Sequence, residues 1–318
     1  MTAVTSAGKY VVTRPASRGA AFWRALVRHW PVYLGGVILP LVVYAVFIGF
    51  PVLSTMYLSL ERWNGLEAQR VFVGLENWRA LFQDPSFTLS LTNNVKWAIV
   101  SLLVPVGGGL LLAVFLSSGK VHFSSAFRAL MFLPSTMSLV SIGVMFAVIL
   151  NPVFGGLNEA LRALGLGFLI REWLEDPNLV LYTLTGVFTW HYLGMAMIMF
   201  HAGISQVPVE LYETAKIEGS GPFQTLWYVT IPMIKPVITV VTVLTVMISF
   251  RAFDIVMVMT RGGPFKQSNV LAYFMYLEAF QKYRFGYGAA IGVCILLLSS
   301  IFAAIYLSRI AGEAEYVS

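Results

Sequence analysis

Hydrophobic residues in this chain occur in long continuous runs that short polar segments separate. Five runs reach the roughly 20 residues that a membrane-spanning helix needs and contain no Asp, Glu, Lys or Arg. They cover residues 31–58, 97–119, 129–158, 177–209 and 285–308. A sixth run, residues 236–260, is apolar apart from Arg251 and Asp254. The pattern predicts an all-α fold: a polytopic membrane protein with six transmembrane helices.

The third and fourth runs are longer than one span requires. Asn151-Pro152 and Gln206-Val207-Pro208 are turn-forming sequences, so we expect each run to leave the hydrocarbon there. Within the second and third spans, the Gly107-Gly108-Gly109 run and Pro134 are expected to permit close helix approach and local unwinding.

Composition excludes a water-soluble globule. Hydrophobic residues make up 58% of the 318 residues and charged residues 11%, against roughly 45–50% and 25% in soluble domains. The net charge of +6 comes from single basic residues between apolar runs, so it indicates membrane topology rather than a nucleic-acid surface. The single cysteine, Cys294, excludes an intrachain disulfide and a metal site built on cysteines.

Charge at the start of the chain predicts its orientation. The first 30 residues carry five basic and no acidic residues: Lys9, Arg14, Arg18, Arg24 and Arg28. The positive-inside rule places them in the cytoplasm, and six spans then place both termini there. The first apolar run is too long for the roughly 7–15-residue core of a signal peptide, so we expect it to remain as an anchor. The basic residues of the fifth connection disagree with this orientation.

One polar segment has residues that typically start and end a short helix. Between the fourth and fifth spans, Pro208 suits a first helical turn, Glu210 and Glu213 favour the positive helix N-terminus, and Gly219 is a natural stop. A helix of about ten residues is too short to span a bilayer. By itself the segment indicates a helical loop at the membrane interface.

The same segment carries a spaced motif. Glu213-Thr214-Ala215 is followed after three residues by Gly219, and nine residues later comes Val229-Thr230-Ile231-Pro232. This resembles the cytoplasmic signature of the membrane subunits of binding-protein-dependent ABC importers, Glu-Ala-Ala, then Gly, then Ile-x-Leu-Pro. Thr214, Val229 and Ile231 depart from it conservatively. The resemblance implies a type I ABC importer permease fold.

In that family the segment is the coupling helix that docks on the ATPase subunit. The resemblance therefore assigns residues 206–228 to the coupling segment, residues 31–310 to a six-span permease domain, and residues 1–30 and 311–318 to cytoplasmic ends. The coupling residues it implies are Glu210, Glu213, Thr214, Ala215, Gly219 and Pro232.

Three further stretches resemble the carbohydrate-importing permeases that include the maltose and glycerol-3-phosphate systems. They are residues 72–87, with Phe72-Val73-Gly74-Leu75-Glu76-Asn77-Trp78, residues 151–158, and Phe253-Asp254 followed by Thr260-Arg261-Gly262-Gly263-Pro264. The resemblance implies a permease subunit of the inner membrane that moves a sugar or polyol derivative. Its expected partners are a second homologous permease, two copies of an ABC ATPase, an extracytoplasmic binding protein and membrane lipid, with no nucleic acid.

We expect no catalysis and no bound cofactor in this chain. It contains no Gly-x-x-x-x-Gly-Lys-Ser/Thr phosphate loop, so ATP and Mg²⁺ are expected on the partner ATPase. A membrane enzyme is disfavoured because His-Glu-x-x-His and Gly-x-Ser-x-Gly are absent. The alternative is a self-sufficient secondary transporter, which would need inverted repeats that the sequence does not show.

Polar and aromatic residues inside the spans are candidates for the substrate passage. Arg251 and Asp254 are three residues apart, so on one helix they can form an ion pair; a gate or a substrate contact is the alternative. His191 and His201, ten apart, cannot share a metal and are expected to be satisfied interior residues. Side chains that could contact a sugar are Asn94, Trp190, Tyr192, Phe250, Phe253 and Asp254.

Overall fold

The computed structural model describes residues 34–118 and 122–314 and contains two units, Met1–Ser54 and Thr55–Ser318. The predictions for residues 1–33, for residue 119 at the end of the second predicted span, and for residues 315–318 of the tail lie outside the described residues. In the first unit an apolar helix is built from η1 (Leu34–Ile38), α3 (Leu39–Tyr44), η2 (Ala45–Gly49) and the start of α4 (Phe50–Leu58). Together with the rest of α4, this helix is the first candidate span, Gly35–Leu58.

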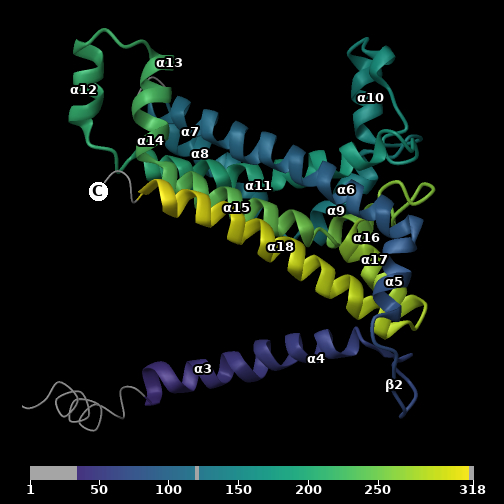
Figure 1. Cartoon of the computed structure of the whole chain (residues 1–318). Helices are drawn as coiled ribbons and strands as arrows, with labels where there is room; N and C mark the ends of the chain where they lie inside the picture. Colours follow the sequence, from purple (N-terminus) through teal and green to yellow (C-terminus); the bar gives the residue numbers. More distant parts are fainter. Residues whose placement is uncertain (1–33, 119–121, 315–318) are drawn as a thin grey trace, which may run out of the picture. The chain divides into compact units, whose positions relative to one another are not determined.

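The second unit is a bundle of long helices that lie side by side (Figure 1). One helix is continuous through α6 (Pro85–Ser101), η3 (Leu102–Gly108) and α7 (Gly109–Ser117). The others are α11 (Val180–Ile204), α15 (Lys235–Phe250) with α16 (Asp254–Met259), and α18 (Phe285–Ala314). Among the described residues, five helices are long and apolar enough to cross a membrane, and the span predicted within residues 129–158 is a bent pair.

The second span begins twelve residues before the predicted position 97, at Pro85. The Asp84 side chain accepts a hydrogen bond from the Ser86 backbone N–H at 2.8 Å, and Pro85 occupies the first helical turn. Hydropathy undervalued this stretch because its polar residues, Ser90, Asn93 and Asn94, are buried inside the bundle. The predicted start of the second span at residue 97 is therefore wrong, because residues 85–96 already belong to its helix.

The third predicted span is broken. α8 (Ser124–Phe132) and η4 (Leu133–Thr136) are followed by α9 (Leu139–Ile149) at an angle of 96°. Pro134 lies in η4, and the Ser138 hydroxyl accepts from the Val140 N–H to start α9 anew. The unwinding predicted at Pro134 is confirmed. The break gives this part of the bundle two helix ends in place of one continuous helix.

The fifth span is interrupted as well. α15 ends at Phe250, Arg251 occupies its C-cap, and α16 begins at Asp254. The single uninterrupted helix predicted for residues 236–260 is therefore wrong at residues 251–253.

The two ends of the bundle carry different small elements (Figure 1). One end, called here the α17 end, holds β1 (Glu61–Arg62) paired antiparallel with β2 (Val71–Phe72). It also holds α5 (Glu76–Gln83), α10 (Gly156–Ala163), η5 (Gly167–Leu169), α17 (Leu271–Tyr276) and η7 (Leu277–Gln281). The other, the α12 end, holds α12 (Val209–Ile217), α13 (Pro222–Thr225), η6 (Leu226–Thr230) and α14 (Ile231–Met233).

Close helix packing holds the bundle together. A Cβ added at Gly109 would lie 3.1 Å from the Ala196 Cβ, and one at Gly194 would lie 1.8 Å from the Met131 carbonyl oxygen. α7 and α8 therefore pack against α11 through small residues, as predicted for the glycine run. A buried hydrophobic cluster contains Trp97 and Phe188, whose rings meet edge to face with their centroids 5.3 Å apart.

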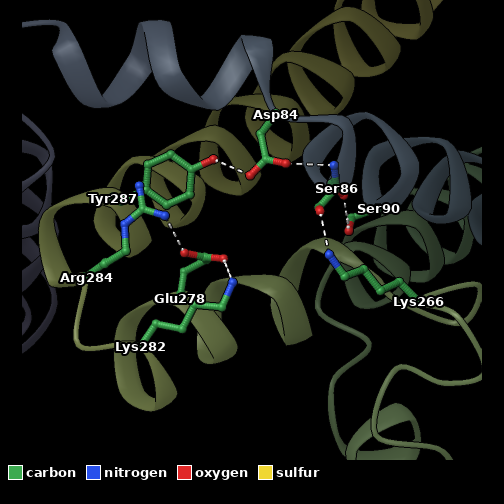
Figure 2. A network of polar contacts seen from close by, with 8 residues as sticks. All are labelled: Asp84, Ser86, Ser90, Lys266, Glu278, Lys282, Arg284 and Tyr287. Atoms are coloured by element: carbon green, nitrogen blue, oxygen red, sulfur yellow. Dashed lines mark hydrogen bonds and ion pairs between the residues drawn. The ribbon is translucent and has the colours of Figure 1, made fainter.

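A polar network fixes the α17 end (Figure 2). Asp84 accepts from the Tyr287 hydroxyl at 2.9 Å and thereby joins the starts of α6 and α18. The buried Glu278 carboxylate accepts from Lys282 at 2.6 Å and from Arg284 at 2.9 Å. Paired in this way, the charge of Glu278 is tolerated in the interior.

Candidate functional site

The polar segment after α11 forms a separate short helix, α12. Pro208 is its N-cap, Glu210 lies in its first turn, and the Thr214 hydroxyl donates to the Glu210 carbonyl at 2.9 Å. The predicted helix of about ten residues is confirmed: α12 has 9 residues, and Pro208 lies one position before its first turn.

Gly219 ends α12 in a left-handed conformation, φ +78°. Its N–H donates to the Lys216 carbonyl at 3.1 Å, and the Ser220 N–H donates to the Ala215 carbonyl at 2.9 Å. This pair of bonds is the hydrogen-bond pattern of a glycine-terminated helix. The helix is therefore defined by its own residues at both ends.

One side of α12 faces the bundle and the other faces away. Ala215 is buried, and the Tyr212 hydroxyl lies 3.4 Å from the Thr230 hydroxyl. Val209, Glu213 and Ile217, spaced four apart, fall on one stripe. This stripe is exposed, and Ile217 is 87% exposed. An apolar side chain so placed is available for a protein partner.

The chain then returns to the bundle through a short helical turn. The Gly221 N–H donates to the Gln224 side-chain oxygen at 3.0 Å, which caps α13. Pro232 lies at the start of α14, immediately before α15 begins at Lys235. The segment that carries α12 thus leads directly into the interrupted fifth span.

The two helix breaks meet at a cavity of about 240 Å³. Leu139, at the start of α9, lines it together with Phe188 and Tyr192 from α11. The rest of its lining is the fifth-span break and its flanks, with Arg251, Ala252, Phe253, Asp254, Ile248 and Ile255. Aromatic faces and charged groups therefore border one small space, which suits a ligand with apolar C–H faces and hydroxyl groups.

A second, apolar cavity of about 600 Å³ adjoins the same break. Arg251 and Phe253 line both cavities, and Phe250, Tyr276 and Phe280 line only the larger one. The Phe253 ring contacts the Tyr276 ring edge to face at 5.3 Å. The break at residues 251–253 is thus the wall between the two cavities.

Comparisons with known proteins identify the family of this chain. Residues 105–309 match the model of the binding-protein-dependent transport system inner membrane component. The chain belongs to this family. The probable ABC transporter permease protein YurN of Bacillus subtilis is 36% identical over 82% of this chain and 90% of its own length. The arabinooligosaccharides transport system permease protein AraP of the same organism is 30% identical over 83% of each chain.

A solved structure has the same fold. A chain of the bacterial alginate ABC transporter, in complex with an alginate pentasaccharide-bound periplasmic protein, superimposes with a TM-score of 0.76 at 21% identity. The match covers 89% of this chain and 95% of that one. The all-α permease fold predicted from the sequence is confirmed, and the protein is a permease subunit of a binding-protein-dependent importer.

In this permease the predicted ion pair between Arg251 and Asp254 does not form. Among the ion pairs of residues 34–118 and 122–314, none joins these two side chains. The prediction assumed one continuous helix, but Arg251 caps α15 and Asp254 opens α16. Both side chains are exposed on this chain and line the smaller cavity.

The six candidate substrate contacts separate into groups. Tyr192, Phe253 and Asp254 do line the smaller cavity, and Phe250 lines the larger one. Trp190 faces a third cavity of about 310 Å³ between α8, η4 and α11, and packs edge to face on Phe146. Trp190 therefore lies outside the space that the breaks enclose.

Asn94 is also placed differently from the prediction. It is 0% exposed, its Nδ2 donates to the Ser249 carbonyl at 3.1 Å, and its Oδ1 accepts from the Leu271 N–H at 2.7 Å. It lines neither cavity at the break. The backbone of two other segments occupies both polar atoms of Asn94 in this structure, so its side chain does not face the cavities at the break.

At the α12 end, His201 bonds to side chains of two other helices. His201 Nδ1 lies 2.8 Å from the Ser117 hydroxyl, and its Nε2 lies 2.5 Å from Arg128 Nη1. Because Arg only donates, Nε2 accepts and the Nδ1–H donates to Ser117. The expectation of a satisfied histidine is confirmed for His201. It is wrong for Nδ1 of His191, which is buried and has no hydrogen-bond partner among the described residues. The role of His201 in joining α7, α8 and α11 had no local signal in the sequence, since its partners come from other spans.

Proposed function

We propose that this permease moves a carbohydrate or polyol derivative across the inner membrane as part of an ATP-driven importer. It would work with a second homologous permease, two copies of an ABC ATPase and an extracytoplasmic binding protein. The similarity to a permease named for arabinooligosaccharides and to an alginate transporter bound to its periplasmic protein supports this class of cargo. ATP and Mg²⁺ would be bound and used by the partner ATPase, and this chain would carry out no chemical step.

The observation that carries the proposal is α12. It is an exposed helix that Pro208 and Gly219 delimit, and its sequence has the spacing of the importer signature. A helix with fixed ends moves as one body when a partner pushes it. Closure of the ATPase dimer would displace α12, and the attached α11 and α15 would transmit the movement to the bundle. Glu210, Glu213 and Thr214 would face or support the ATPase contact.

The proposal includes a topology. The α12 end faces the cytoplasm, the α17 end faces outward to the binding protein, and both termini are cytoplasmic. The basic N-terminal segment supports this orientation. α12 supports it as well, because the ATPase is a cytoplasmic partner.

The passage would run past the fifth-span break. Tyr192 and Phe253 offer aromatic faces to the C–H faces of a sugar ring, and Arg251 and Asp254 offer a donor and an acceptor to its hydroxyls. Because Arg251 and Asp254 form no ion pair with each other, both are available to a hydroxylated ligand.

The test is the assembled complex in lipid vesicles with its binding protein. Arabino-oligosaccharides, lactose, diacetylchitobiose and alginate oligosaccharides are screened for stimulation of ATP hydrolysis and for uptake. The proposal predicts that at least one sugar raises ATP hydrolysis and is taken up only when ATP is present. Sugar uptake without ATP, by vesicles that contain this permease and no ATPase, would instead support a secondary transporter. Stimulation by none of the sugars, with stimulation by an amino acid, would overturn the carbohydrate assignment.

A further inference from the structure

Two adjacent asparagines of α6 are held entirely by backbone atoms of distant segments. Asn93 is 1% and Asn94 0% exposed. Asn93 Nδ2 donates to the carbonyls of Gln267 and Asn269, both at 2.9 Å. Asn94 bonds instead to Ser249 and Leu271. The two neighbours therefore hold different parts of the fifth span and the loop that follows it.

Asn94 supplies a donor at the fifth-span break. In a continuous helix the Ser249 carbonyl would accept from the N–H of residue 253. Here the helix ends, and this carbonyl accepts from the Ala252 N–H at 3.3 Å and from Asn94 Nδ2 at 3.1 Å. Because Ser249 and Asn94 are both 0% exposed, water does not provide this bond. Asn94 thus donates a hydrogen bond to a backbone carbonyl at the end of α15, where the helix break removes the usual N–H donor.

The acceptor of the same side chain serves a second helix end. Leu271 is the first residue of α17, and its N–H has no partner within that helix. Asn94 Oδ1 accepts from it at 2.7 Å. One amide therefore ties the second span to the end of α15 and to the start of α17.

The chemistry of this position requires both a donor and an acceptor. An amide carries both on one short side chain, whereas a carboxylate accepts only and an alkyl group does neither. If the amide were turned round, its NH₂ would face the Leu271 N–H and its oxygen would face the Ser249 carbonyl. Both contacts would be repulsive, so the orientation of Asn94 is determined by its partners.

We propose that Asn94 is a positioning residue: it holds the break at residues 251–253 in shape, so that Arg251, Phe253 and Asp254 border the passage, without contacting the cargo itself. Asn93 secures the loop after α16 and does not act on the break. Only the effect of this role on transport rests on the proposed function. The geometry that it describes exists without any sugar.

The test uses a cysteine reporter at the break. Ala252 is 4% exposed and lines the smaller cavity, so Ala252→Cys is a small change. Cys294 is the only native cysteine, and Cys294→Ser gives a silent background. The rate at which N-ethylmaleimide labels the reporter is measured in the complete transporter in membrane vesicles, without sugar or ATP. A second reporter, Ala113→Cys, lies on the second span, about 28 Å from Asn94 along the helix, and is 0% exposed.

Asn94→Asp is predicted to raise the labelling rate at Ala252→Cys about tenfold, because it removes the donor to Ser249 and so favours local opening. Asn94→Ser, whose hydroxyl can still donate and accept over a shorter reach, should give an intermediate rate. Asn93→Asp and Thr92→Ala should leave this rate unchanged, since Asn93 donates to the loop carbonyls and the Thr92 hydroxyl donates to the Thr88 carbonyl within its own helix. The rate at Ala113→Cys should stay the same throughout.

Two outcomes would overturn the proposal. One is an Asn94→Asp rate equal to that of Thr92→Ala, which would show that the break keeps its shape without the amide. The other is an equal rise at Ala113→Cys, which would show general loosening of the bundle. Because labelling needs no cargo, failure of the carbohydrate assignment would leave this result intact, and unchanged labelling would leave the carbohydrate assignment intact.

Discussion

α12 and the loop between α16 and α17 are both connections between spans, and they are built in opposite ways. α12 is closed by bonds among its own residues, and its Val209, Glu213 and Ile217 face outward. The loop is almost wholly buried at residues 268–271 and is held by Asn93 and Asn94 from a distant span. A connection with local bonds and an exposed face can be moved by a partner. A connection held by long-range buried bonds resists movement and keeps the wall of a passage in place.

The largest loss of stability is expected from Gly286→Ala at the α17 end. A Cβ there would lie 1.9 Å from the Glu61 carbonyl oxygen, and backbone cannot yield to it cheaply. We expect a loss of about 3 kcal/mol or more, measured as a lower thermal midpoint and a lower yield of assembled complex. Gly186→Ala, with no atom within 4 Å of the added Cβ, is the matched control. Equal yields and midpoints for the two variants would contradict the rigid packing of this end.

A smaller loss is expected when the polar network of the α17 end is broken. Glu278→Gln removes the charge that faces Lys282 and Arg284, both of which are half exposed. We expect a destabilisation of about 2 kcal/mol, again from the thermal midpoint of the complex. Glu76→Gln, which breaks the exposed pair with Arg62, should cost less than about 1 kcal/mol. A midpoint for Glu278→Gln no lower than that for Glu76→Gln would show that the buried carboxylate adds nothing.

At the α12 end, we expect Gly219→Ala to reduce stability less than the changes at the α17 end. We expect it to reduce coupled transport more than stability. Gly219→Ala places a side chain at φ +78° and should cost about 1 kcal/mol at the helix stop. Gly221→Ala, at φ −73°, is the control and should behave as the unaltered protein. The complex with Gly219→Ala should assemble, while uptake and stimulated ATP hydrolysis decrease together. Normal uptake in both variants would remove the reason to treat the glycine stop as part of the coupling device.

The same contrast explains what the sequence predicts well and what it does not. The spans follow from apolar runs, and α12 follows from Pro208, Glu210 and Gly219, because each signal lies within the element it defines. The break at residues 251–253 has no comparable signal in the sequence. Hydropathy is averaged over a window of residues, so a helix end inside the window leaves the average unchanged. The residue type of Asn94, a polar amide inside a span, predicts a ligand contact. Its actual partners, Ser249 and Leu271, are 155 and 177 residues away, and only the tertiary structure brings them together.

The most direct test of the account is whether the exposed stripe of α12 contacts the ATPase. In a Cys294→Ser background, Ile217→Cys is labelled with a photoactivatable cross-linker in the complete transporter, and Leu66→Cys, 78% exposed at the α17 end, serves as the control. The account predicts a cross-link from position 217 to the ATPase subunit that changes in yield when ATP is bound, and none from position 66. A cross-link to the ATPase from position 66, or none from position 217 in an intact complex, would contradict the assignment of α12 as the coupling helix.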